Sequence, residues 1–148
     1  MTRPASRSPH DRFAKPACAL EILLGVGALA GGAALMLGPR GEILPLSVSA
    51  LEGSPFDTYV VPGLILFVVL GLGPLLAARL AWRRHPLAPL AACAVGVALL
   101  VWLAVEIAII GFSVTPPLQP FYLLLGVVIT VVGLAWRRSG AQPSGSGA

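Results

Sequence analysis

The chain has 148 residues, of which 57% are hydrophobic and 11% are charged, and its mean hydropathy is +0.89. A soluble globular domain carries about 25% charged residues, and a domain of this size has too little interior to hide so much apolar surface. We therefore expect lipid to surround most of the chain. The net charge of +4 comes without a basic face or interleaved aromatic residues, so nucleic acid is not an expected partner.

The chain begins with a polar, basic segment, residues 1–15, whose composition is typical of a disordered tail. An apolar run follows at residues 17–37 and is interrupted only by Glu21. About 20 apolar residues cross the hydrocarbon core of a bilayer, and this run exceeds the roughly 7–15 residues of a signal-peptide core. We therefore expect an uncleaved first membrane helix. Small residues near Ala30 leave a cleaved signal peptide as the alternative.

The longest loop, residues 38–59, separates the first run from the rest of the chain. Three further apolar runs follow, at residues 60–80, 87–110 and 121–136. Pro62 falls in the first turn of the second run, where a missing N–H costs little, whereas Pro74 lies inside that run and predicts a kink. The runs are continuous and do not alternate, so they predict helices and not membrane strands. Residues 139–148 have the composition of a flexible tail.

The basic residues predict the orientation of this all-α, membrane-spanning four-helix bundle of residues 16–138. One side of the predicted bundle holds nine of the ten Lys and Arg residues, and the other side holds only Arg40. The nine are Arg3, Arg7, Arg12, Lys15, Arg79, Arg83, Arg84, Arg137 and Arg138. Basic residues in short loops face the cytoplasm. We therefore expect a multi-pass plasma-membrane protein with both termini in the cytoplasm.

Aromatic residues at the ends of the apolar runs fit the same topology. Trp82 and Trp136 would form a belt at the inner interface, and Tyr59 and Tyr122 a belt at the outer one.

Small residues predict where the helices touch each other in the membrane. Gly27 and Gly31 form a GxxxG pattern in the first helix, and Gly126 and Thr130 lie four residues apart in the fourth. Such patterns are common in apolar segments. Packing within one bundle is the preferred interpretation, and formation of a homo-oligomer is the alternative.

Glu106 is the main candidate for a functional side chain because it lies about one turn inside the third helix. A carboxylate at membrane depth is costly unless it is neutral or has a partner, and such residues are often functional. The sequence does not decide between a functional role and a packing role for Glu106. The expected partners come from the same depth and are Tyr59, Ser113, Gln119 and Tyr122.

Three other carboxylates are weaker candidates. Glu21, near the inner end of the first helix, is expected to be an interfacial group within reach of Arg12 or Lys15. Glu52 and Asp57 lie in the long loop and would make the outer face acidic, which could attract a cation or a basic ligand.

Neither a metal site nor a cofactor site is predicted. The two cysteines are far apart, and no Cys/His cluster has metal-ligand spacing. The sequence also contains none of the common hydrolase, nucleotide-binding or metalloprotease motifs. An enzyme is therefore the least favoured class.

A resemblance rests on three segments of the chain. They are LEGSPFDTYVVPGL at residues 51–64, Val105-Glu106-Ile107 with Ile110-Gly111, and LQPFY at residues 118–122. These segments resemble small four-helix bacterial membrane proteins of unknown function, and the excess of Ala, Gly, Pro and Arg suits an actinobacterial genome. The resemblance covers most of residues 17–138 and implies architecture but no activity. It draws attention to Ser54, Pro55, Phe56, Tyr59, Pro62, Gly63, Glu106 and Gln119.

Two functions follow as expectations. The first is a structural or accessory protein that binds another membrane protein or a lipid. The alternative is a transporter or channel subunit for a proton, a cation or a small solute, with Glu106 in the path. In both cases we expect the functional side to be the outer face, where the loop at residues 54–63 would fold over Glu106.

Overall fold

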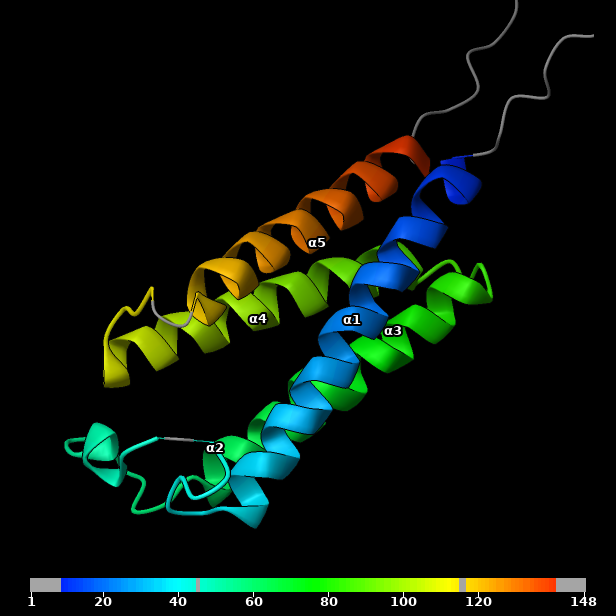
Figure 1. Cartoon of the computed structure of the whole chain (residues 1–148). Coiled ribbons are helices and arrows are strands. Elements are labelled where there is room, and N and C mark those ends of the chain that lie inside the picture. The colour runs from blue at the N-terminus through cyan, green and yellow to red at the C-terminus, as the bar shows by residue number, and fades with distance from the viewer. Residues whose placement is uncertain (1–8, 45, 115–116, 141–148) are drawn as a thin grey trace, which may run out of the picture.

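The computed structural model describes residues 9–44, 46–114 and 117–140, which form helices joined by loops (Figure 1). The helical spans are α1 (Pro9–Leu37), a second span made of three consecutive segments, α4 (Ala88–Ile110) and α5 (Leu118–Gly140). All four are long and apolar enough to cross a membrane. The prediction of four helices that could span a membrane is therefore confirmed by their length and composition.

Both end helices are longer than the apolar runs that predict them. α1 begins at Pro9, inside residues 1–15, which the sequence predicts to be a tail, and α5 continues to Gly140. The remaining parts of the two predicted tails, residues 1–8 and 141–148, lie outside the described residues.

The second span changes its helical geometry near its middle. It runs as α2 (Val60–Ile65), then as a π-helical segment, η2 (Leu66–Leu72), and finally as α3 (Gly73–Trp82). Pro74 explains the change, because proline lacks an N–H and its ring crowds the carbonyl four residues earlier. The wider π turn makes room, and the Gly73 N–H bonds to the Val68 carbonyl five residues before it. The irregularity that Pro74 predicts therefore takes the form of a π segment.

The helices form two pairs that meet at one end and diverge at the other (Figure 1). One pair is α4 with α5, and the other is α1 with the second span. The pairs meet where α1 begins and α5 ends. The loop of residues 38–59, which contains the short 3-10 turn η1 (Val48–Leu51), lies at the divergent end and reaches α4 through η1.

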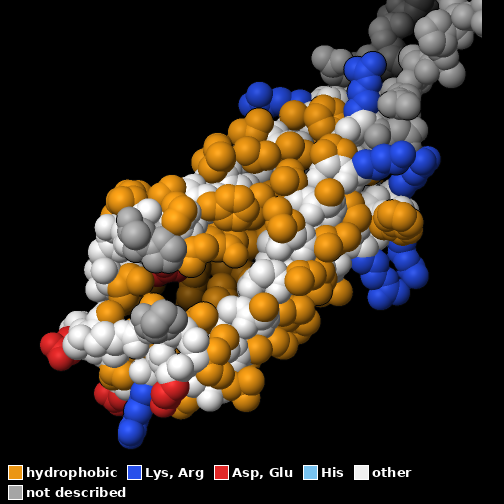
Figure 2. All heavy atoms as spheres, in the orientation of Figure 1, with side chains coloured by type: hydrophobic (Ala, Val, Ile, Leu, Met, Phe, Trp, Pro, Cys, Tyr) orange, Lys and Arg blue, Asp and Glu red, His pale blue; other side chains and the backbone are white. Residues whose placement is uncertain are grey.

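Charged side chains separate between these two ends (Figure 2). The end where the pairs meet, here the basic end, carries the exposed side chains of Arg12, Lys15, Arg79, Arg83, Arg84, Arg137 and Arg138. The divergent end, here the acidic end, carries the exposed side chains of Glu42, Glu52 and Asp57. Among the described residues, Arg40 is the single cation at the acidic end.

Small side chains close the basic end around one tryptophan. The cluster consists of Ala14, Ala17, Cys18, Ala78, Ala81, Ala88 and Trp136. Trp136 is only 1% exposed, whereas Trp82 at the same end is 81% exposed. The predicted inner belt is therefore wrong for Trp136, because the alanines leave a space that its indole fills. Tyr59 is also buried, at 6% exposed, and not a belt residue.

Glycines allow close helix contacts, although only some of them are those that the sequence predicts. Gly126 and Thr130 of α5 face Gly96 of α4, where an added Cβ would lie 2.7 Å from the Thr130 nitrogen. On α1 the close contacts to the second span come from Gly25 and Gly32: an added Cβ on Gly32 would lie 2.7 Å from the Gly63 carbonyl oxygen.

The GxxxG pair of α1 has a different role from the predicted one. An added Cβ on Gly31 would meet only a side-chain carbon of Leu66, at 3.5 Å, and one on Gly27 only the Tyr122 hydroxyl, at 3.1 Å. Both glycines line an internal space and do not press against a neighbouring backbone.

Candidate functional site

A cavity of about 480 Å³ lies between the diverging helix pairs, near the acidic end (Figure 2). Its deepest walls are the buried core side chains Leu24, Leu70, Leu99 and Leu103, which come from α1, η2 and α4. Trp102 and Tyr122 complete the sides. The volume falls within the roughly 300–1,000 Å³ of small-molecule sites in proteins. The mostly apolar walls suit an apolar occupant.

The loop of residues 38–59 covers this cavity. Its lining side chains are Leu44, Leu46, Leu51, Phe56 and Tyr59. Two hydrogen bonds hold the loop closed: the Tyr59 hydroxyl donates to the Ser47 carbonyl at 2.7 Å, and the Tyr59 N–H donates to the Pro39 carbonyl at 2.9 Å. Burial raises the pKa of the Tyr59 phenol. The loop therefore lies over the space that Glu106 also lines.

Glu106 of α4 and Gln119 of α5 form the polar part of the cavity. The Gln119 side-chain amide donates to Glu106 Oε1 at 3.1 Å and to the Gly111 carbonyl at 3.2 Å. Its oxygen accepts the Ser113 N–H at 2.6 Å. Gln119 is only 5% exposed. It thus joins the end of α4 to the start of α5 and holds Glu106 at the cavity wall.

Of the four partners expected for Glu106, Gln119 is the one whose side chain reaches it. Ser113 contributes indirectly, through its backbone N–H to Gln119. Tyr59 is bonded to Ser47 instead. A carboxylate has about four lone-pair sites, and within the described residues Gln119 occupies one of them.

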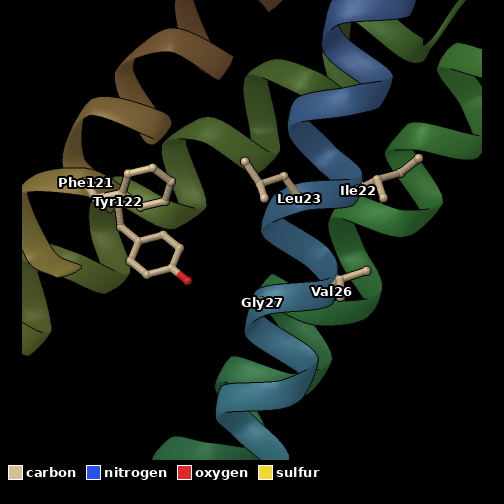
Figure 3. A pocket seen from close by; sticks show the side chains of 6 residues that line it. All are labelled: Ile22, Leu23, Val26, Gly27, Phe121 and Tyr122. Carbon is tan, nitrogen blue, oxygen red and sulfur yellow. The ribbon is translucent and has the colours of Figure 1, made fainter.

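A second hollow, of about 400 Å³, lies between α1 and α5 on the outside of the bundle (Figure 3). It is lined by Ile22, Leu23, Val26, Gly27, Phe121 and Tyr122. Gly27 and Tyr122 line the cavity as well. The Tyr122 ring extends from α5 towards α1 (Figure 3). This side chain therefore lies between the second hollow, which we call the outer groove, and the cavity.

The other acidic candidates lie away from the cavity lining. Glu52 and Asp57 are exposed at the acidic end and contribute to its charge without meeting Glu106. Glu21 lies one turn below the cavity wall residue Leu24, towards the basic end. Glu21 and Glu106 therefore do not form a carboxylate pair.

Glu21 is completely buried, which contradicts the expectation of an interfacial carboxylate. Within the described residues, neither of its carboxylate oxygens has a hydrogen-bond partner. Arg12 and Lys15 are exposed. Because a helix turns about 100° per residue, these two basic residues point roughly 120–180° away from Glu21. The continuous helix from Pro9 thus separates the charges that the sequence brings close together.

No group of three His, Cys, Asp or Glu side chains within the described residues could hold a metal ion. Cys18 and Cys93 are buried and are not joined by a disulfide. Comparisons with protein-family models, with curated proteins and with solved structures find no match to this chain.

Proposed function

We propose that the protein is a small accessory protein of the plasma membrane that binds a lipid in the cavity at the acidic end. The cavity carries this proposal, because it is mostly apolar, large and lined by side chains from every span and from the loop. Apolar walls without an occupant lose their van der Waals contacts on one side, so a space of about 480 Å³ is costly to leave vacant.

A lipid chain is the occupant that best removes this cost. Water is held in cavities by two to four polar partners, and these walls offer few polar groups beside Glu106, Gln119 and two tyrosines. In a bilayer, apolar chains surround the protein at high concentration. The outer groove between α1 and α5 places such chains next to the cavity.

Native mass spectrometry in mild detergent tests whether a lipid is retained. Gly31→Leu should occupy part of the cavity and narrow it, since a Cβ at Gly31 meets only Leu66 at an ordinary contact distance of 3.5 Å. Ala30→Leu is the matched control, because Ala30 is exposed on the same helix. We expect abundant lipid adducts on the wild type and on Ala30→Leu and clearly fewer on Gly31→Leu. Equal adducts on all three proteins would reject the proposal, and the same spectra report whether the chain forms a homo-oligomer.

We also propose that the basic end faces the cytoplasm, as the distribution of Lys and Arg favours. Single cysteines at exposed positions, Val48→Cys at the acidic end and His85→Cys at the basic end, would report this. The native thiols are buried. A membrane-impermeant maleimide should label intact cells through Val48→Cys and only lysed cells through His85→Cys. The reverse pattern would invert the topology.

A transporter for a proton, a cation or a small solute is the second candidate. Two observations favour it: the helix pairs pack together at the basic end and diverge around a cavity at the acidic end, and Glu21 is buried without a hydrogen-bond partner within the described residues. Buried carboxylates in spans often belong to proton or ion paths. Flux into proteoliposomes that is identical for the wild type and Glu106→Ala would reject a path through Glu106.

A further inference from the structure

We propose that the cavity takes an amphiphile with one apolar tail and an amine head group, whose amine contacts Glu106. This inference rests on the proposed lipid-binding function and adds the chemistry of the head group. It follows from the hydrogen-bonding state of the polar residues, from the charge of the acidic end and from the shape of the way in from the bilayer.

Beside Glu106 and Gln119, the polar groups of the cavity are tyrosine hydroxyls and the Trp102 indole, and no Lys or Arg side chain lines it within the described residues. Both hydrogens of the Gln119 amide are already used, one by Glu106 and one by the Gly111 carbonyl. Glu106 Oε2 is left, and an ionised carboxylate can only accept. An anionic phosphate or carboxylate head group would meet the Glu106 carboxylate with no lining Lys or Arg to balance its charge. An amine supplies both the donors and the positive charge that this site lacks.

The surroundings favour the same head group. Glu42, Glu52 and Asp57 are exposed at the acidic end, and among the described residues Arg40 is the single opposing cation there. Charges of one sign around a cleft with apolar walls raise the local concentration of ligands of the opposite sign. An amine at the membrane surface is therefore drawn towards the end where Glu106 lies.

The tail has a narrow way into the cavity from the bilayer. The groove between α1 and α5 is lined by side chains that are about half exposed, among them Leu23 at 54% and Val26 at 56%. It is separated from the cavity by the Tyr122 ring, whose hydroxyl lies over Gly27 (Figure 3). Rotation of the Tyr122 ring would join this groove to the cavity and let one hydrocarbon chain pass between α1 and α5.

Trp102 provides a signal for the test because it lines the cavity. Trp82 and Trp136 lie at the basic end, away from the cavity lining. The probes are three 12-carbon chains that each carry bromine, a fluorescence quencher, at the tail and differ only in an amine, alcohol or carboxylate head group. Each is titrated into the protein in nanodiscs of uncharged lipid. Trp102→Phe gives the background to subtract.

We expect the amine to bind the wild type at least about tenfold more tightly than the alcohol, as removal of a charged hydrogen bond usually costs. The carboxylate should bind most weakly. Glu106→Gln keeps an oxygen for the Gln119 amide but removes the charge, so its preference for the amine over the alcohol should fall to about one.

The outcomes separate the two proposals. If the wild type quenches equally with all three head groups, the head-group inference is wrong and lipid binding stands. If no probe quenches Trp102, the proposed lipid-binding function fails as well. The comparison of head groups on the wild type needs no variant, so misfolding of Glu106→Gln would not rescue the inference.

Discussion

The side chain of Gln119 binds the Glu106 carboxylate across the turn that joins α4 and α5, at 3.1 Å. The same amide also bonds to the backbone of Gly111 and Ser113 in that turn. One nearly buried side chain therefore fixes both the geometry of the turn and the position of the only carboxylate that lines the cavity within the described residues. Gln119 therefore stabilises the fold at this end and also positions Glu106, the candidate functional side chain.

Gln119→Leu should destabilise the protein by about 2–3 kcal/mol, because it removes three hydrogen bonds of one nearly buried side chain, each worth about 1 kcal/mol. Glu106→Gln is the matched control: its amide oxygen can still accept from Gln119, so we expect a change below about 0.5 kcal/mol. Unfolding by heat or by sodium dodecyl sulfate measures both. Equal losses for the two variants would show that the charge of Glu106, and not the bonds of Gln119, stabilises this end.

Gly96→Ala should separate α4 from α5. The added methyl would lie 2.7 Å from the Thr130 nitrogen and 2.9 Å from the Gly126 carbonyl oxygen, and backbone atoms cannot move aside cheaply. Overpacking of this kind costs about 1–3 kcal/mol. Gly31→Ala, the same change where the space is open, should leave the unfolding midpoint unchanged or slightly raised. The prediction fails if both variants behave alike.

Much of the fold is predictable from run length and from the positions of Pro and Arg. Runs of about 20 apolar residues have few alternatives to a membrane helix, and Pro74 marks the irregular part of the second span. The rotation of each helix about its axis is harder to predict from the sequence. Lipid and the protein interior are equally apolar, so hydrophobicity does not show which face of a helix contacts its neighbours. Gly27 and Gly31 matched a contact pattern, yet Gly25 and Gly32 make the contacts to the second span.

The partner of Glu106 was predictable, because few polar side chains lie at its depth. The burial of Trp136 was not, because it depends on how small side chains pack in three dimensions. Gln119 was one of few polar groups at the depth of Glu106, and the structure joins the two. Trp136 matched an interfacial pattern, but alanines on three helices leave a space for its ring. A signal for Glu21 did exist. It continues the helical stripe of buried residues Ala14, Ala17, Leu24 and Ala28.

Glu21→Met should stabilise the protein, since it replaces a buried carboxyl group without a hydrogen-bond partner in the described residues by an apolar chain of similar size. Burial of an unsatisfied polar group costs about 1–3 kcal/mol in mutational data, and we expect a gain of that order. Glu21→Gln keeps a polar group in place and should change stability much less. Both are measured as shifts of the unfolding midpoint in one detergent. A loss of stability in Glu21→Met would mean that the carboxyl group contributes favourably to the fold.

Tyr59→Phe should loosen the loop over the cavity and change its response to alkaline pH. The variant loses the 2.7 Å bond to the Ser47 carbonyl, worth about 1 kcal/mol. Burial raises the pKa of Tyr59 in the folded protein, so the unfolded chain ionises first, near pH 10. The stability advantage of the wild type over Tyr59→Phe is therefore constant below about pH 10 and shrinks above it. Thermal unfolding of both proteins between about pH 8 and 11 measures this difference, in which the other titrating groups cancel. An advantage that grows with pH would show that the tyrosinate, and not the neutral phenol, fits the closed loop.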